Sequence, residues 1–153
     1  MRDIEDSDRR LLRHLQAAHD LGISELAARA GLSAGATTRR LDRLERDGVI
    51  EGSEAVIDWR ALGYSVEVSL RVSLEKTQSN AFDEFIAAAR DIPEVDEIQT
   101  FLGRVDVRLN VLARDMAHYQ EIYRRKILNL PHINDIEALM LVADVKRSES
   151  LPL

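Results

Sequence analysis

The sequence SAGATTRRLDRLER, residues 33–46, decides the interpretation of the N-terminal part of the chain. Ser33 is a good N-cap for a helix over 34–46, because its hydroxyl oxygen can accept a hydrogen bond from a free backbone amide of the first turn. Leu41 and Leu44 lie on one face of that helix together with Thr37. The helix carries four arginines against two acidic residues, a local charge of +2. The pattern therefore predicts a basic, amphipathic helix.

Two shorter helical segments precede this helix. Residues 25–30 form the nearer one, with Ser24 as its expected N-cap and Gly31 as its left-handed C-cap. An earlier helix is indicated by apolar residues at helical spacing, namely Leu11, Leu12, Leu15 and Ala18. Small side chains at 27 and 28 allow two helices to approach closely. Three short helices with a glycine turn before the last predict a helix-turn-helix, whose last helix enters the DNA major groove.

The start of the basic helix has no bulky side chain, so its backbone can approach base edges and phosphates. We expect Gly35, Ala36, Thr38 and Arg39 to contact the groove, and Arg40 and Arg43 to contact phosphates. The candidate DNA-binding residues are thus Ser33, Gly35, Ala36, Thr38, Arg39, Arg40 and Arg43. The alternative is a solvated helix face whose charges only pair with one another.

The second half of the chain alternates strand and helix patterns. Residues 64–74 place Val66, Val68, Leu70, Val72 and Leu74 at a period of two, as in a strand with one buried face. Further strands are expected over 95–102, 105–111 and 136–145, and helices over 81–91 and 115–128. The segment 92–98 resembles 130–136, which indicates a repeated βαβ unit. The order predicts a ferredoxin-like βαββαβ sheet, with helices on one face and a partly apolar open face that favours dimerisation.

Composition excludes several classes of protein. The 153 residues include no cysteine, which rules out disulfides, thiolate metal sites and a cysteine nucleophile. The net charge of −6 argues against general nucleic-acid coating but allows a local basic face. No apolar run approaches the roughly 20 residues of a membrane span, and no signal-peptide core is present. We expect a cytoplasmic protein that has no membrane contact, needs no cofactor or metal, and is not an enzyme.

Three motifs carry a resemblance to a known family: DRRLL at 8–12, SELAARAGLS at 24–33 and RRLDRLERDGVI at 39–50. Together with the βαββαβ order, Gly103 and the segment 130–135, they resemble the Lrp/AsnC family of feast/famine regulators over about residues 4–147. The resemblance implies a helix-turn-helix domain, a linker strand and a ferredoxin-like effector domain. It also implies homodimers that can assemble to tetramers or octamers, and DNA binding modulated by amino acids bound between subunits.

The resulting domain prediction has three parts, all within an α+β fold. Residues 1–50 are the helix-turn-helix domain, 51–63 the linker, and 64–153 the effector-binding and oligomerisation domain. Val56 and Ile57 are expected to form a short strand in the linker.

The sequence departs from the family pattern at the expected effector loop. The family's Gly-Asp-Tyr-Asp is here Gly103-Arg104-Val105-Asp106. Gly103, Arg104 and Asp106 are the candidate effector-binding residues, because Asp106 can pair with an ammonium group and Arg104 with a carboxylate. The alternative is that Asp106 only accepts hydrogen bonds from turn amides while Arg104 extends into solvent. Elsewhere, Ala34 replaces the family's proline, and Thr37 replaces a buried valine or cysteine.

The favoured function is a sequence-specific DNA-binding transcriptional regulator modulated by an amino acid. One alternative is a small-molecule-binding or enzymatic ferredoxin-like protein whose helical part mediates protein contacts only. That alternative does not need the basic helix. A further alternative is a family member without an effector, which organises DNA.

Overall fold

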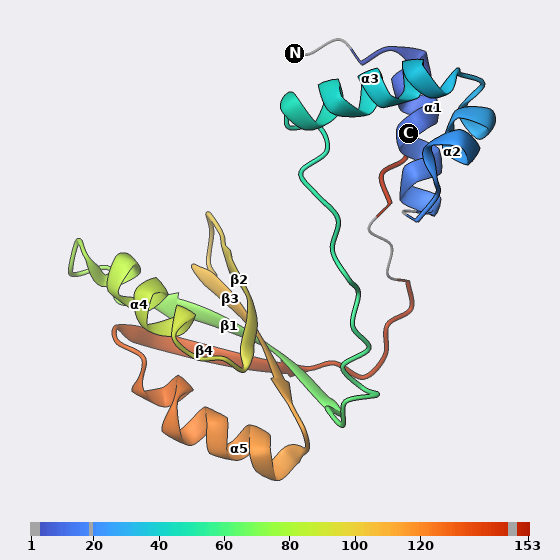
Figure 1. Ribbon diagram of the computed structural model, residues 1–153. Helices are drawn as coiled ribbons and strands as arrows, with labels where there is room; N and C mark the ends of the chain where they lie inside the picture. Colours follow the sequence, from blue (N-terminus) through green and yellow to red (C-terminus); the bar gives the residue numbers. More distant parts are fainter. Residues whose placement is uncertain (1–3, 19, 147–149) are drawn as a thin grey trace. The chain divides into compact units, whose positions relative to one another are not determined.

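The computed structural model describes residues 4–18, 20–146 and 150–153 (Figure 1). The chain divides into two compact units. The first comprises Met1–Val56 together with Lys146–Leu153, and the second comprises Ile57–Val145. The predicted effector domain ran from 64 to the last residue. The structure instead groups the C-terminal tail with the helical unit.

The helical unit contains α1 (Asp6–Ala17), α2 (Ile23–Ala30) and α3 (Ala34–Arg46). Its core consists of Leu11, Leu26, Ala30 and Leu44. The predicted bounds of α3 are confirmed, and the Ser33 hydroxyl accepts a hydrogen bond from the Ala36 amide at 3.2 Å. Gly31 ends α2 at φ 69°, the left-handed conformation that favours glycine. The predicted Ser24 cap is wrong, because α2 already begins at Ile23 after Gly22.

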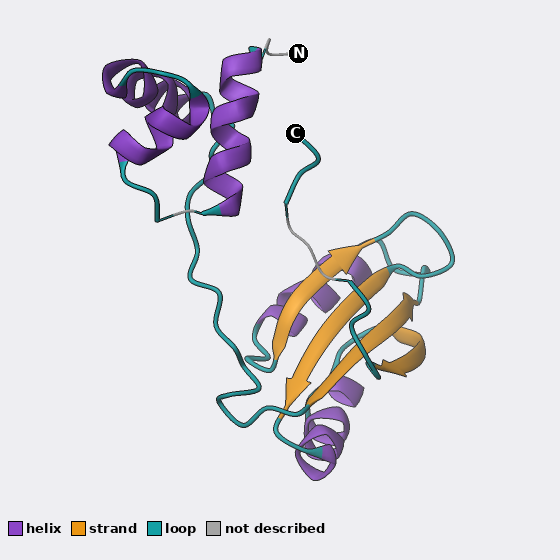
Figure 2. Ribbon diagram, turned by 90° about the vertical axis from the view of Figure 1, so that its right-hand side faces the viewer, coloured by secondary structure: helices purple, strands orange, loops and turns teal. Residues whose placement is uncertain are grey.

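The second unit is a four-stranded antiparallel sheet with two helices on one face (Figure 2). Its strands are β1 (Val66–Leu74), β2 (Val95–Thr100), β3 (Val107–Ala113) and β4 (Ile133–Met140), in the spatial order β2-β3-β1-β4. The helices are α4 (Ala81–Arg90) and α5 (Met116–Arg125), the latter followed by a 3₁₀ turn at Ile127–Asn129. The predicted ferredoxin-like α+β fold is confirmed.

The period-two pattern correctly identified the buried face of the sheet. Val68, Leu70 and Val72 of β1 pair with Val111, Leu109 and Val107 of β3, and all six are buried beneath the helices. Phe85 and Ala89 of α4 and Ile122 of α5 complete this core. The opposite face carries Glu67, Ser69, Arg71 and Ser73 of β1, with leucines only near one end. These leucines are Leu112, Leu139 and Leu141.

Two strand predictions were wrong, the bounds of the last strand and the short strand in the linker, and both depend on which segments pair with them. β4 begins at Ile133, opposite Leu74, and ends at Met140, because its neighbour β1 spans only Val66–Leu74. Val56 and Ile57 form no strand, since no described segment pairs with them. Their side chains are exposed, Val56 by 91%. No helix in the described parts of the chain is long and apolar enough to cross a membrane.

Candidate nucleic-acid interface and effector pocket

The outward face of α3 carries exposed residues close to the helix N-terminus, where the side chains are small. Gly35, Thr38 and Arg39 are exposed, and Ala36 is half-buried. A Cβ at position 35 would lie 3.5 Å from Arg39 Nη1, an ordinary van der Waals contact, so Gly35 and Arg39 are neighbours on this face. The hydroxyl of Thr38 donates to the Ala34 carbonyl at 3.1 Å, and Ser33 caps the helix. Arg39 has no ionic partner among the residues that the structure describes.

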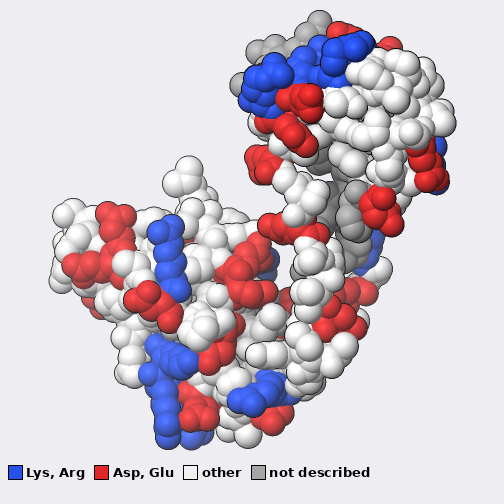
Figure 3. Space-filling view, in the orientation of Figure 1, with Lys and Arg blue, Asp and Glu red and all other residues white. Residues whose placement is uncertain are grey.

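Arg46 belongs to the same face, and the sequence interpretation did not select it. It lies seven residues after Arg39, so both side chains project from one side of the helix. It is exposed and makes no ion pair with any described residue. The heptad spacing was the signal that could have identified it. In the view of Figure 3, a cluster of basic side chains lies over α3.

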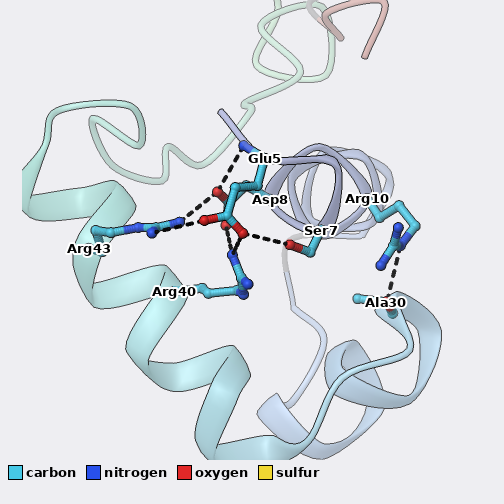
Figure 4. A network of polar contacts seen from close by, with 7 residues as sticks. All are labelled: Glu5, Ser7, Asp8, Arg10, Ala30, Arg40 and Arg43. Atoms are coloured by element: carbon cyan, nitrogen blue, oxygen red, sulfur yellow. Dashed lines mark hydrogen bonds and ion pairs between the residues drawn. The ribbon is translucent and has the colours of Figure 1, made fainter. Parts of the chain in front are cut away.

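Arg40 and Arg43 are held by acidic residues at the start of α1 (Figure 4). Arg40 Nη1 donates to Asp8 Oδ1 at 2.8 Å, and Arg43 Nη2 donates to Asp8 Oδ2 at 2.6 Å. Glu5 adds contacts of 3.0 Å to Arg40 and 3.7 Å to Arg43. The Asp8 side chain is only 1% exposed. This acidic clamp, Glu5 and Asp8, attaches α3 to α1.

The clamp distinguishes the two arginines. Hydrogen bonds to Asp8 and Glu5 raise the pKa of Arg40 above its ordinary value. Its side chain is 24% exposed, whereas that of Arg43 is 41% exposed. Both residues were predicted from the sequence to contact phosphates, and the paired carboxylate was not foreseen. Arg43 retains the larger surface for an external partner.

The candidate effector residues lie at the end of the second unit where β1 ends. An open pocket of about 1210 Å³ is lined there by charged and polar side chains, including Arg71, Lys76, Arg104, Asp106, Asp135 and Glu137. The side chain of Asp106 is largely buried. Its Oδ2 accepts from the Leu74 amide at 2.9 Å, and its Oδ1 lies 3.2 Å from Lys76 Nζ.

The other two candidate residues are exposed. Arg104 lines the pocket and has no ionic partner among the described residues. Gly103 has open space around it. Asp106 therefore anchors the loop to the end of β1, while the Arg104 guanidinium is available. No group of three or more metal-binding side chains occurs within the described residues.

Comparison with known proteins decides the family. The family described as "Lrp/AsnC ligand binding domain" matches residues 67–151, and "Winged helix-turn-helix DNA-binding" matches residues 4–51. The chain belongs to the Lrp/AsnC family. It is accordingly a DNA-binding transcription regulator and not an enzyme, as the sequence predicted.

Three relatives cover most of this Lrp/AsnC chain. The leucine-responsive regulatory protein of Salmonella typhimurium is 31% identical over 98% of the chain and 92% of its own length. The proline dehydrogenase transcriptional activator of Rhodobacter capsulatus is 35% identical over 85% of this chain and 84% of its own. The solved structure of a transcriptional regulator from Neisseria meningitidis, in complex with L-methionine, has a TM-score of 0.91 at 26% identity. It covers 98% of this chain and 97% of the other.

Proposed function

We propose that this regulator recognises its operator through the outward face of α3. The observation that carries the proposal is an exposed Arg39, which has no ionic partner among the described residues, beside the side-chain-free Gly35. An arginine in the major groove can donate two hydrogen bonds to guanine O6 and N7, worth about 1–3 kcal/mol of discrimination. Thr38 and Ala36 flank it, and Ser33 orients the first turn. Because a regulator of this family acts on DNA, we also place it in the cytoplasm.

Arg43 and Arg40 would fix the position of α3 on the DNA backbone. Arg43 contacts a phosphate directly through its exposed part. Arg40 acts mainly through the acidic clamp, which holds α3 against α1. Such contacts position the protein without reading bases. We add Arg46 to this set because it is exposed on the same face as Arg39.

We further propose a homodimer, or a larger assembly built from dimers, as the active form. The exposed apolar side chains of Val56 and Ile57, and the leucines on the open face of the sheet, support this proposal. Burial of such surface is the usual driving force for association. Two copies related by a two-fold axis would bind a roughly palindromic operator.

The role of Arg39 in sequence recognition is tested by measuring the preference for promoter DNA over a random duplex. Fluorescence anisotropy compares promoter DNA with a random duplex for the wild type and for Arg39→Ala. The matched control is Arg90→Ala, which removes an exposed arginine from the end of α4. Arg39→Ala is expected to reduce the preference for promoter DNA about tenfold, which corresponds to about 1.4 kcal/mol. Equal preference in both variants would refute the assigned face.

The second part of the proposal is an amino-acid effector at the pocket that contains Arg104. A zwitterion needs a cation for its carboxylate, and the Arg104 guanidinium, which pairs with no acid in the described parts of the chain, offers one. The complex of the Neisseria relative with L-methionine supports an amino acid as the class of ligand. Asp106 keeps the loop in place through Leu74 and would face the ammonium group with Lys76 displaced.

A regulator without an effector is the second candidate, because both carboxylate oxygens of Asp106 already have partners. Thermal shift with each of the twenty amino acids separates the two candidates. Saturable stabilisation by one of them, reduced in Arg104→Ala but not in Arg114→Ala, supports an effector. Arg114 is an exposed arginine outside the pocket lining. If none of the twenty amino acids raises the melting temperature, the result favours the regulator without an effector.

A further inference from the structure

A second concave surface lies on the helical unit, away from the outward face of α3. A groove of about 430 Å³ runs between α1 and residues 49–54. Leu12 and Leu15 of α1 form one wall, and Val49 and Ile50 form the other. Unlike the effector pocket, it is lined mainly by apolar side chains, so it suits an apolar ligand.

The C-terminal tail lies along this groove, and its Leu151 and Leu153 are among the residues that line it. The Gln16 side-chain amide forms two hydrogen bonds with the backbone of Leu151. Its Oε1 accepts from the Leu151 amide at 2.6 Å, and its Nε2 donates to the Leu151 carbonyl at 3.4 Å. Arg13 Nε donates to the Leu153 carbonyl at 2.9 Å. Arg13 and Gln16 are three residues apart, so both lie on the same side of α1.

The tail has the conformation and chemistry that such a groove accepts. The Leu153 amide donates to the Leu151 carbonyl at 2.9 Å across Pro152, a tight turn that the fixed φ of proline favours. Leu153 is half-buried against the groove, while Leu151 is 65% exposed. The groove therefore binds the backbone through polar side chains and one leucine through apolar contact.

We propose that this groove is a binding site for a short apolar peptide segment, and that its occupant is the tail of the same chain, residues 150–153. The chain leaves the helical unit after Val56 and returns to it at Lys146. Docking of the tail thus adds a second, noncovalent attachment to the covalent connection that follows Val56. A second attachment removes conformations that a unit held by one linker would sample.

The tether has a consequence for DNA binding, which rests on the proposed function. It would limit the positions that α3 can take relative to the effector domain, and so the spacing of half-sites that a dimer can bind. Docking itself is independent of DNA, so its test is made without DNA. Failure of the DNA proposal would leave that test unaffected.

Cross-linking tests whether the tail docks. The chain has no cysteine, so Gln16→Cys combined with Leu151→Cys introduces the only thiols. The control pair is Gln120→Cys with Leu151→Cys, since Gln120 is an exposed glutamine on α5. Under mild oxidation the first pair is expected to form an intrachain disulfide at least about tenfold faster than the control. Equal rates of disulfide formation in the two pairs would overturn docking. Disulfide-linked dimers would show that the tail docks on another copy and not on its own chain.

Distance measurement tests whether docking restrains the units. Spin labels at Ser24→Cys on α2 and Gln120→Cys on α5 report the distance between the units, with unlabelled protein added so that only intrachain pairs contribute. Arg13→Ala with Leu153→Ser removes the contacts that the tail keeps in the cross-linking variant, and it is expected to broaden this distribution at least about twofold. Arg90→Ala with Leu102→Ser makes the same changes at exposed positions and should leave the width unchanged. Equal widths in all three proteins would overturn the tether.

Discussion

Replacement of Asp8 by asparagine should destabilise the helical unit without weakening its attraction for DNA. The substitution keeps the shape of a side chain that is 1% exposed but removes the charge shared by Arg40 and Arg43. Hydrogen bonds between charged groups contribute about 1.5–3 kcal/mol each, so the two bonds to Asp8 contribute about 3–6 kcal/mol.

Part of this contribution is recovered in the variant. The asparagine oxygen can still accept one hydrogen bond, worth about 1 kcal/mol. Arg40 and Arg43 are 24% and 41% exposed, so water and Glu5 partly replace the lost carboxylate. The net loss in free energy of unfolding is therefore about 2 kcal/mol. For a unit of this size it corresponds to a melting temperature about 8–16 °C lower.

Guanidinium unfolding, with hydrogen exchange on α1–α3 to assign the transition, measures this loss. Asp6→Asn is the matched control, because it removes an exposed carboxylate from the same first turn of α1. Its cost should stay below about 1 kcal/mol, the size of a helix-dipole interaction. Binding to a random duplex should be at least as tight for Asp8→Asn as for Asp6→Asn, since both remove one negative charge and only Asp8→Asn releases Arg43. Equal stability of the two variants would refute the clamp.

Three further predictions concern single residues. Thr37 is fully buried and its hydroxyl has no hydrogen-bond partner in the described structure, so Thr37→Val should raise the free energy of unfolding by about 1 kcal/mol, whereas Thr38→Val, at an exposed position, should not. Gly31→Ala places a Cβ at φ 69° and should lower the free energy of unfolding by about 1 kcal/mol. An unchanged melting temperature would contradict the left-handed cap. Burial raises the pKa of Glu94, but the hydrogen bonds from Lys126, a backbone hydrogen bond and the nearby positive charges of Lys126 and His118 together outweigh it, so the pKa lies below the ordinary 4.5. The stability from this pair is present above that value and is lost as the pH falls through the lowered pKa, so Glu94→Gln should flatten the acid limb of the pH–stability curve, and an identical limb would disprove the pairing.

Most of the fold could be predicted from local patterns. Helix α3 was predicted with its observed bounds, because Ser33 and the apolar spacing act within one or two turns of the chain. The buried face of β1 followed from alternation alone, since successive strand residues point to opposite sides. Gly31 was identified for the same reason: its conformation depends on the residue itself and the helix it ends.

Contacts between distant residues decided the functional details. Asp8 meets Arg40 across 32 positions, Asp106 meets Leu74 across another 32, and Gln16 meets Leu151 across 135. No local periodicity encodes such pairs, because they form only when packing brings their elements together. Val56 and Ile57 also show that distant partners matter, because these two residues favour a strand by type but form none. A segment becomes a strand only when a neighbouring segment pairs with its backbone amides and carbonyls. Side-chain type and order thus sufficed for α3 with its Ser33 cap, for the Gly31 cap and for the buried face of β1. The Ser24 cap, the bounds of β4, the partners of charged groups and the position of the tail depended on the folded chain.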